Sequence, residues 1–551
     1  MTFVLRLITV WCARLSRIGL IVGVLFLALS LTPSLVPRPL IYQGLVSGLS
    51  LTLGYALGVA GRWLWAYLGL PQAGDRLARI LTASGAVVGV AFLGLFIWQA
   101  SEWQNSVRQL MHLPPASGVS PFSLAAVTLL AFGVLVSLAR LFRQTFVIIA
   151  ARFDRFLPQR VANVVGVAVS VALFWTILDG ILIAAALRFA DGVSQQVDAS
   201  TPVDLEPPAD PQRTGSRESH VAWEDLGRQG REFVSTGPTA ADLRAFFGYE
   251  TPTPIRVYVG LNAAETPDAR ARLALRELER VGAFDRAVLL LVTPTGTGWV
   301  DPAALSPVEY LHRGDIASVA VQYSYLPSVI ALPTEGAYGA ENARALFQAV
   351  YGHWTRLPKE RRPALYLYGV SLGALNSERS FDVHDIIADP FRGILLTGPP
   401  FRSELRHLLT SDRRPDSPAW RPRFRDGSVV RFMNQQGGLE VGDAPWGPFR
   451  IAFLQYASDP MTFFSVRSLF VEPDWMRGPR APDVSPALRW YPVVSTVQLA
   501  ADMAVANAPP PGYGHNFAAE HYVDAWRALM EPDGWTASEV RRLKTLHASM
   551  P

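Results

Sequence analysis

The sequence predicts two parts, an α-helical transmembrane bundle followed by an α/β domain with a mostly parallel sheet and helices on both faces. Long uncharged runs fill most of the first 190 positions. Strand-like and helix-like patterns alternate from position 255 onward. The chain of 551 residues is also too long for one domain of ordinary size. These three observations together predict a membrane part and a globular part.

Five apolar runs predict five membrane-spanning helices. Each is near the roughly 20 residues that a helix needs to cross the hydrocarbon core of a bilayer. A signal peptide would begin in a similar way, but here further apolar runs follow the first one instead of a polar chain. A sixth span, or a re-entrant piece around 144–151, is an alternative. The five runs are 18–37, 39–61, about 80–100, 121–139 and 161–187.

Arginine placement predicts the orientation of these spans. Arginines gather at the N-terminus and in the second and fourth loops, whereas the other loops have little more than Arg38 and Arg108. Because cytoplasmic segments are enriched in Lys and Arg, we expect the N-terminus in the cytoplasm. Five spans then place everything after Arg188 outside the cytoplasm, and an even number of spans would reverse this.

Asp179 lies inside the last predicted span. An ionisable group at that depth is costly, which makes Asp179 a candidate functional residue. The alternative is a polar contact between packed helices, or a residue near the end of a shorter span. In the first span, Pro33 and Pro37 are expected to break the end of the helix.

The domain boundaries follow from a change in composition. Asp, Pro, Ser, Thr, Gln and Arg replace the apolar runs over 190–220, as is typical of a flexible or extended linker. We therefore expect a multi-span membrane domain over 1–190, a linker and connecting segment over 191–235, and the α/β domain over 236–551.

The elements of the α/β domain are predicted from their periodicity. Residues 287–293 form a continuous apolar run, as expected of a strand buried on both faces. The alternation of strands and helices favours a mostly parallel sheet. Further strands are expected at 255–261, 318–325, 364–368, 394–397 and 451–457, and helices at 268–281 and 340–354.

A Gly-x-Ser-x-Gly motif follows the strand at 364–368 and predicts an α/β-hydrolase fold. The motif has Ser371 between Gly369 and Gly373, with Ala374 next. In a nucleophile elbow, a strand turns sharply into a helix with the serine at the apex, and the flanking residues must be small. The motif alone occurs by chance in many chains, but here an apolar strand precedes it. Ser371 is therefore the candidate nucleophile.

An acid and a histidine follow Ser371 in the chain order of an α/β hydrolase. Asp459 comes directly after the strand at 451–457, at the sheet edge where such folds hold their sites, and His515 lies on a loop with glycines. Asp459 could instead cap a turn before Pro460, and His515 could be an ordinary loop histidine. The reserve acids are Asp389 and Asp502, and the rival histidine is His521, which lies inside a helical pattern.

An oxyanion hole needs two backbone N–H donors. We expect one from Leu372, which follows the nucleophile, and the other from Thr295 or Gly296 in the loop after the strand at 287–293. This loop also resembles a phosphate-binding turn, but it lacks the lysine and the spacing of a P-loop. We therefore expect no nucleotide cofactor, and no His, Asp or Glu cluster has the spacing of a metal site.

Composition excludes some other classes. The single cysteine, Cys12, rules out intrachain disulfides and cysteine-based metal sites. The net charge of +4 is small for this length, and no dense basic run carries interleaved aromatic residues. We therefore expect no nucleic-acid partner.

The chain resembles the bacterial membrane-anchored alpha/beta-hydrolase family, which is largely uncharacterised. That family pairs a multi-span N-terminal domain with a C-terminal hydrolase domain, and the resemblance implies a protein of the bacterial inner membrane. The family often has glutamate just before the nucleophile, where this chain has Val370. The matching stretches are Leu31–Arg38, Leu226–Val234, Thr293–Trp299, Gln322–Ser328, Ser371–Ala374, Gly398–Phe401 and Ser458–Pro460.

Two functions follow as hypotheses. The first is a membrane-anchored serine hydrolase or acyltransferase that acts on a lipid or cell-envelope ester, because an anchor raises the local concentration of substrates in the membrane. The second assigns the function to the membrane domain, as a lipid- or solute-handling unit with Asp179, and makes the hydrolase fold a non-catalytic interaction module. The Arg- and Pro-rich tracts 402–425 and 472–489 are expected to form a lid, a membrane-facing cap or ordinary surface loops.

Overall fold

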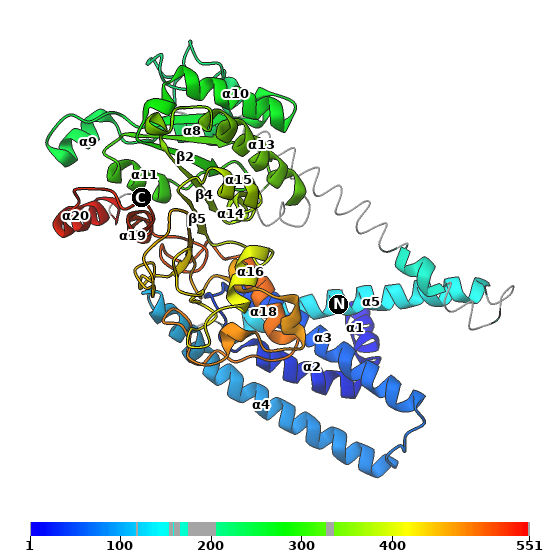
Figure 1. The fold of residues 1–551 in the computed structure, drawn as a ribbon. Helices are drawn as coiled ribbons and strands as arrows, with labels where there is room; N and C mark the ends of the chain where they lie inside the picture. The colour runs from blue at the N-terminus through cyan, green and yellow to red at the C-terminus, as the bar shows by residue number, and fades with distance from the viewer. Residues whose placement is uncertain are drawn as a thin grey trace. The chain divides into compact units, whose positions relative to one another are not determined.

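The computed structural model describes residues 2–116, 120–153, 158, 166–172, 174, 205–326 and 336–548. The chain forms two compact units (Figure 1). One, here called the helical unit, comprises Met1–Leu187 and Phe464–Val505. The other, the sheet unit, comprises Arg188–Phe463 and Ala506–Pro551.

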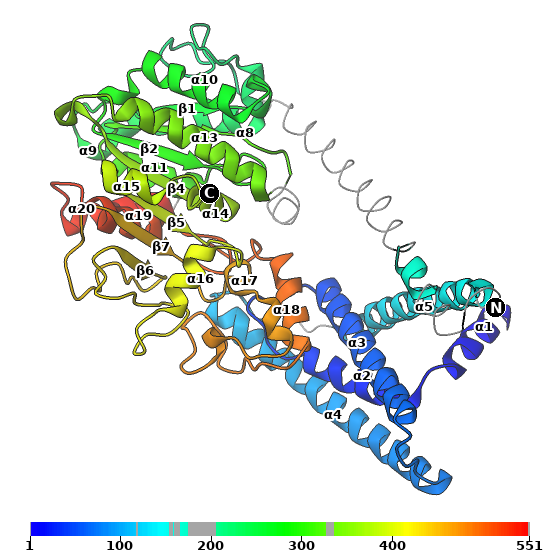
Figure 2. The same ribbon diagram turned by 45° about the vertical axis from the view of Figure 1, so that its right-hand side comes forward.

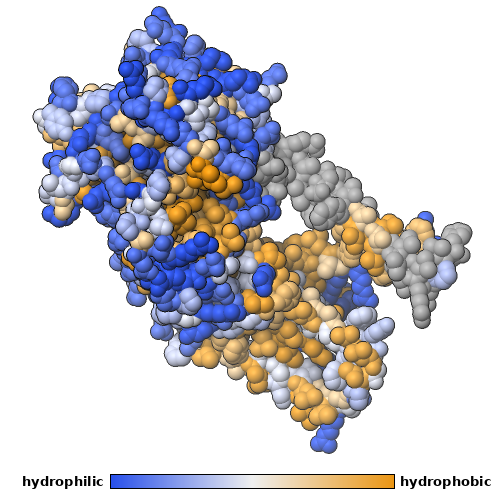
Figure 3. All heavy atoms as spheres, viewed as in Figure 1, coloured by the Kyte–Doolittle hydropathy of each residue, from blue (hydrophilic) through white to orange (hydrophobic). Residues whose placement is uncertain are grey.

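Among the described residues, three helices of the helical unit are long and apolar enough to cross a membrane, which points to membrane association. They are α3 (Leu40–Tyr67), α4 (Asp75–Leu110) and α5 (Pro121–Phe153), and they follow the shorter α1 (Thr2–Ala13) and α2 (Arg17–Ser30). Large apolar side chains such as Val87 and Trp98 are exposed on α4, and Figure 3 shows hydrophobic residues over these helices. Such a surface is expected where lipid replaces water.

Of the five predicted spans, the first ends earlier than expected, and the fifth falls mostly on residues that the structure does not describe. The first run, 18–37, is a helix only to Ser30, and the chain is non-helical from there until α3 begins at Leu40. Pro33 and Pro37 lie in this break, as the sequence predicts. The fifth run, 161–187, lies largely outside the described residues, and so does Asp179.

Small residues let the helices of this unit approach closely. A side chain at Gly54 would come within 2.8 Å of the carbonyl oxygen of Val22, and one at Gly58 within 2.8 Å of the α-carbon of Gly19. In a membrane, where water does not drive helices together, such close backbone packing contributes much of the association. Glycines at Gly44 and Gly48 allow the same approach between α3 and α5.

The segment 464–505 belongs to the helical unit, although the sequence predicts one α/β domain over 236–551. It contains η6 (Val466–Leu469), η7 (Asp474–Met476) and α18 (Val494–Met503), and α18 packs against α2 and α3. The tract 472–489 lies inside it. Local sequence patterns could not reveal this placement, because it depends on side chains far apart in the chain.

Among the residues that the structure describes, the sheet unit has seven strands in the order β1-β3-β2-β4-β5-β7-β6, and every neighbouring pair is parallel. Periodicity correctly predicts all of them except β6, which at four residues is the shortest of these strands. The strands are β1 (Ile255–Val259), β2 (Val288–Thr293), β3 (Ile316–Val321), β4 (Ala364–Val370), β5 (Gly393–Thr397), β6 (Val430–Met433) and β7 (Arg450–Leu454).

Helices cover the sheet in two groups. The helix α10 packs against α13, and α11 packs against α19 and α20 (Figure 2). The main helices are α8 (Gly227–Ser235), α9 (Ala240–Phe247), α10 (Pro267–Arg280), α11 (Pro302–Leu311), α13 (Gly336–Trp354), α14 (Leu372–Ser377), α15 (Val383–Ala388), α16 (Glu404–Ser411), α17 (Pro460–Phe463), α19 (Ala519–Met530) and α20 (Ala537–Ala548).

The helix α8 corrects the predicted linker over 191–235. It packs against β1, and a side chain at Gly230 would come within 2.4 Å of the ring of Tyr258. Its polar sequence resembles a linker, but Phe233 and Val234 are buried in the core of the sheet unit. Val221, Trp223 and Leu226, which precede α8, are buried in the same core, so these residues and α8 are part of the fold of the sheet unit.

A buried ion pair in this core gives a test of stability. Arg256 donates from Nε and Nη2 to the two carboxylate oxygens of Glu309, at 2.6 and 2.7 Å, and both side chains are buried. We expect Arg256→Met to cost about 3 kcal/mol or more, because Glu309 is left charged and unpaired. The melting temperature of the full-length protein measures this.

The matched control is Arg244→Met, which breaks an exposed pair with Glu250 in the same unit. An exposed pair contributes less than about 1 kcal/mol, so this variant should melt near the wild-type temperature. Equal melting temperatures for the Arg256 and Arg244 variants would contradict the prediction.

Candidate active site

Ser371 stands at a sharp turn between strand β4 and helix α14. Its backbone has φ 57° and ψ −125°, a conformation that a residue with a side chain rarely adopts. A side chain at Gly369 would come within 2.4 Å of the Gly373 backbone, and one at Gly373 within 2.2 Å of the carbonyl oxygen of Thr293. The glycines are therefore required by the close packing of strand, turn and helix, as in a nucleophile elbow.

The turn places Ser371 at the carboxyl edge of the sheet. Strand β4 lies between β2 and β5, and the N–H of Ser371 donates to the carbonyl oxygen of Thr397 at 2.9 Å. Ser371 is 5% exposed. In parallel α/β sheets, this edge is where ligands bind.

Asp459 lies just after strand β7, at the same edge. Its carboxylate is fully buried and accepts hydrogen bonds from the N–H of Met461 and the hydroxyl of Thr462, both at 2.8 Å. The same Oδ2 atom lies 2.7 Å from Nδ1 of His515. These contacts hold the carboxylate in one orientation, and the sequence-predicted acid and histidine meet.

His515 lies on a loop that is fixed by its backbone. Its N–H donates to the carbonyl oxygen of Ala506 at 2.8 Å, and the N–H of Gly514 donates to the hydroxyl of Ser458 at 3.0 Å. With Nδ1 directed at Asp459, the other ring nitrogen, Nε2, is buried and has no hydrogen-bond partner among the described residues. A buried nitrogen without a partner is unusual in a folded protein and invites a functional explanation.

Gly398 connects the histidine to the elbow. It follows Thr397, whose carbonyl oxygen accepts from Ser371, and its own N–H donates to Leu454 at the end of β7. A side chain at Gly398 would come within 2.9 Å of Cε1 of His515, the ring atom next to Nε2. The imidazole therefore lies against the peptide segment that also holds the backbone of Ser371.

The alternative acids and histidine are engaged elsewhere. Asp389 pairs with Arg362 at 2.5 Å, and Asp502 pairs with an arginine of the helical unit. His521 lies on α19, where its Nδ1 is 2.6 Å from the hydroxyl of Tyr456. Of the acids considered from the sequence, Asp459 is the one bonded to His515.

The predicted oxyanion loop packs against the elbow, but one of its predicted donors is already used. The N–H of Thr295 donates to the carbonyl oxygen of Trp299 at 3.0 Å, within the tight turn of the loop itself. Leu372 is the first residue of α14, where a backbone N–H has no partner inside the helix. The roles of Leu372 and Gly296 stay predictions, and Thr295 is disfavoured as a donor.

The sequence analysis missed a buried polar group behind this edge. Asp301 begins α11 and accepts a hydrogen bond from the hydroxyl of Tyr522 at 2.9 Å, and Tyr522 in turn lies 3.0 Å from the hydroxyl of Tyr368. Burial raises the pKa of Asp301 to about 6, against the opposing effects of the Tyr522 hydrogen bond and the nearby His515. In the sequence, an Asp-Pro pair predicts only the N-cap of a helix, and it gives no sign that the carboxylate is buried.

A second missed group lies at the end of the elbow helix. Glu378 follows α14 and accepts a hydrogen bond from the hydroxyl of Ser403 at 2.6 Å. Burial raises the pKa of Glu378 to about 7, and the Ser403 hydrogen bond opposes this. Arg406 is buried nearby and donates to the side chain of Gln455, and burial lowers its pKa to about 10.

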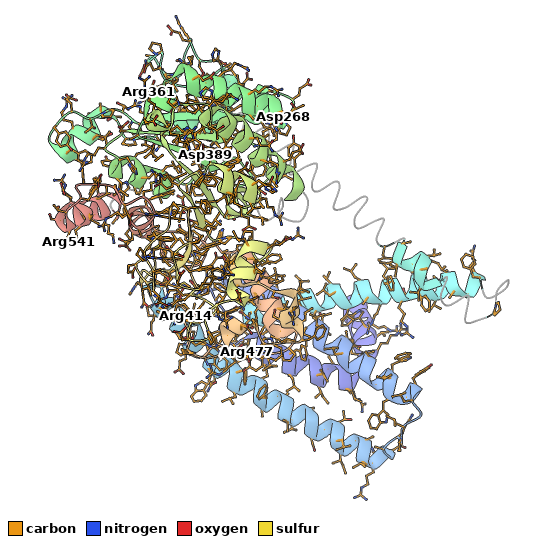
Figure 4. The ribbon with its side chains drawn as sticks, viewed as in Figure 1. Asp268, Arg361, Asp389, Arg414, Arg477 and Arg541 are labelled. Carbon is orange, nitrogen blue, oxygen red and sulfur yellow. The ribbon has the colours of Figure 1, made fainter. Side chains whose placement is uncertain are left out.

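The two Arg- and Pro-rich tracts form local ion pairs. In the tract 402–425, Arg414 pairs with Asp416 and with Asp443. In the tract 472–489, Arg477 pairs with Asp474 at 3.2 Å. Figure 4 labels both arginines on their separate units. Such pairs are those of ordinary polar surface, and the lid or cap stays a prediction.

The comparisons with known proteins agree with the fold of the sheet unit. A family model described as the alpha/beta-hydrolase family matches residues 255–543. The chain belongs to the alpha/beta-hydrolase family. A second model, described as the N-terminus of the same family, matches residues 31–238. No curated protein and no solved structure matches the chain. Across the part of the chain that the structure describes, no group of His, Cys, Asp and Glu could hold a metal ion.

The raised pKa of Glu378 predicts a dependence of stability on pH. The folded protein holds this proton more tightly than the unfolded chain, so the stabilisation is complete below the ordinary pKa of 4.5 and is lost as the pH rises through about 7. We expect Glu378→Gln to remove this loss and to be more stable than the wild type at pH 8, by on the order of 3 kcal/mol. Melting temperatures at pH 5 and pH 8 measure it.

The control for this prediction is Glu341→Gln, because Glu341 is exposed on helix α13 and is not among the groups that shift the pKa of Glu378. It should leave the pH dependence as in the wild type. Parallel melting curves for the wild type and the Glu378 variant would contradict the prediction.

Proposed function

We propose that this protein is a serine hydrolase that cleaves or transfers acyl esters, with Ser371 as nucleophile, His515 as base and Asp459 as the group that orients the histidine. The observation that carries the proposal is the imidazole of His515. Its Nδ1 is held by Asp459, its buried Nε2 has no hydrogen-bond partner among the described residues, and the ring lies against Gly398, next to the residue that holds the backbone of Ser371. A serine hydroxyl becomes a nucleophile when an imidazole oriented in this way is within its hydrogen-bond reach, and this supports the proposal.

The reaction then runs in two halves. The Oγ of Ser371 attacks the ester carbonyl while Nε2 of His515 takes its proton, and the backbone N–H of Leu372, with a donor near Gly296, stabilises the oxyanion. The intermediate collapses to an acyl-enzyme, and His515 returns the proton to the leaving alcohol. Water or a second alcohol then takes the acyl group by the same steps in reverse order. Asp459 stays ionised and stabilises the imidazolium that forms in each half.

The substrate class follows from the apolar helices. An enzyme tethered to a bilayer meets lipid and cell-envelope esters at a high local concentration. We therefore propose a membrane lipid or an envelope acyl ester as substrate. We further propose that the protein is integral to a bacterial inner membrane, with its sheet unit on the extracytoplasmic side, as the arginine distribution of the N-terminal region favours.

The first test of this function is Ser371→Ala. We expect hydrolysis of a fluorescent acyl ester by the full-length protein to fall at least about 10³-fold, because no other group replaces the attacking oxygen. Labelling by a fluorophosphonate probe should be lost as well. Ser377→Ala is the matched control, since Ser377 is a buried serine at the far end of helix α14, the helix that Ser371 precedes. A Ser371 variant with full turnover, or a wild-type protein that does not label, would contradict the proposal.

A second test concerns the space beside the histidine. We expect Gly398→Ala to lower kcat at least about tenfold, because the added methyl group would meet the rings of His515 and Phe517 and displace the imidazole. Esterase assays at saturating substrate measure it. Gly248→Ala is the control. Gly248 also has a positive φ, +81° compared with +50° for Gly398, but a methyl group added there would meet no atom within 4 Å. Equal kcat values in the two variants would count against the placement of His515.

A further inference from the structure

The helical unit has a groove between α2 and α4, which we call the α2–α4 groove. Its volume is about 340 Å³, within the range of sites that hold small ligands. A side chain at Gly85 would meet Ile21 at 3.2 Å, and one at Gly89 would meet Val24 at 3.7 Å. Because the residue numbers of both helices rise together along this contact, the two helices run in the same direction and begin at the same end of the groove.

The groove is lined by apolar and small residues along most of its length. Gly85, Ala86 and Gly89 line it from α4. Thr82 lines it as well, but its hydroxyl donates to the carbonyl oxygen of Ala78 at 2.6 Å, inside its own helix. Water needs two or more polar partners to occupy a cavity, and the described lining of this stretch offers few. An apolar chain is therefore the occupant that fits.

Two arginines line one end of the groove. Arg17 is the first residue of α2, and Arg79 lies on the second turn of α4. Both residues are exposed. Nε of Arg79 donates to the carbonyl oxygen of Asp75 at 3.2 Å, and among the described residues neither guanidinium pairs with a carboxylate. The apolar groove thus has a positively charged end without a counter-ion in the described part of the chain.

The sequence around this end has a strong excess of positive charge. Asp75 is the first acidic residue of the chain, and the next is Glu102. Arg14 and Arg76 add further positive charge to the segments that hold the two arginines of the groove. The arginine distribution assigns both segments to the cytoplasmic side of the membrane. The positive end is therefore expected at the level of the headgroups of that leaflet, which carries anionic lipids.

The length and the charge of the groove together fit one class of lipid. The stretch from Arg79 to Val90 spans roughly 16 Å of helix, about half of a hydrocarbon core ~30 Å thick. An acyl chain that lies along it stays in one leaflet, with its headgroup at the arginines. A guanidinium donates two parallel hydrogen bonds to phosphate oxygens, so two of them favour a headgroup with a net negative charge. A zwitterionic headgroup brings its own cation to the same place, where the arginines repel it.

We propose that the α2–α4 groove binds an anionic phospholipid, with its phosphate between Arg17 and Arg79 and one acyl chain along the small residues of α4. This rests on the membrane location that we propose for the protein, and it is independent of the proposed hydrolase reaction. The lipid is a resident ligand of the helical unit: it fills the space between α2 and α4 and neutralises the two arginines.

The test measures lipid binding by the full-length protein in a mild detergent, with phosphatidylglycerol and phosphatidylcholine of identical acyl chains in equal amounts. Native mass spectrometry counts the lipids that stay bound. We expect phosphatidylglycerol to bind the wild type at least about tenfold more tightly, since charge-assisted hydrogen bonds distinguish the two headgroups. Inorganic phosphate should not displace it, because phosphate alone lacks the acyl chain that fills the groove.

Removal of the two charges tests the positive end. With Arg17→Gln and Arg79→Gln together, we expect the two lipids to bind within about twofold of each other. The matched control combines Arg62→Gln and Arg76→Gln, which remove the same charge from exposed arginines of α3 and α4 that do not line the groove. It should keep the preference for phosphatidylglycerol. Equal loss in both double variants would show an effect of overall charge and would overturn the site.

Filling the groove tests the place of the acyl chain. Ala86→Phe leaves both arginines and puts a ring into the groove, so binding of phosphatidylglycerol should weaken at least about tenfold. Val88→Phe is the control, because Val88 is 63% exposed on the same helix and does not line the groove. Melting temperature and elution volume show that the variants are folded, as expected for changes at exposed positions.

The outcomes separate the lipid site from the proposed location. If alkaline carbonate extracts the protein from membranes, the location fails and the lipid site fails with it. If the protein is integral but binds both lipids equally, or binds phosphatidylglycerol as tightly after Ala86→Phe, the site fails and the location stands. A wild type that holds no lipid, or a dimer that Ala86→Phe alone disrupts, would show another occupant of the groove and would also overturn the proposal.

Discussion

The backbone at Ser371 is the constraint on which the candidate site depends. A serine with φ 57° persists only if the surrounding structure holds it, and here β2 and β5 flank its strand while the following helix presses against the turn. Replacing Gly369 or Gly373 with any residue that has a side chain would break the contact between the strand, the turn and the helix. The same packing brings the loop after β2 to the elbow, which is where an oxyanion would need its donors. The strained backbone of Ser371 and the candidate site therefore both depend on the same packing of β2, β4, β5 and α14.

Two buried aspartates show how environment separates the candidate acid from a reserve acid. Asp459 follows strand β7 and Asp502 lies in helix α18, and both are fully buried. Asp459 receives two neutral donors from its own turn and then His515, a partner able to accept and release a proton. Asp502 receives Arg38, whose charge is permanent. The first arrangement suits proton transfer, and the second suits only a fixed position.

The sequence predicts the parts of this protein whose signals are local. The apolar run at 287–293, the motif around Ser371 and the chain order of Asp459 and His515 each carry their meaning within a few residues, and the structure has the expected strand, the expected turn and the expected contact. The division of the chain is different, because the place of α18 in the helical unit depends on Arg38, more than 460 positions away. Likewise, the use of the Thr295 N–H inside its own loop follows from a turn that no composition rule specifies.

The break between α2 and α3 is better explained by its contacts with helix α18 than by the membrane. A spanning segment that needed only to cross lipid would continue as an apolar helix, with its backbone groups satisfied internally. Here the chain instead opens over 31–39 and exposes carbonyl and N–H groups, which Gln498 and Asp502 satisfy. Arg38 is tolerated in this buried place only because Asp502 is present. The N-terminal stretch and the α18 helix are thus each incomplete without the other.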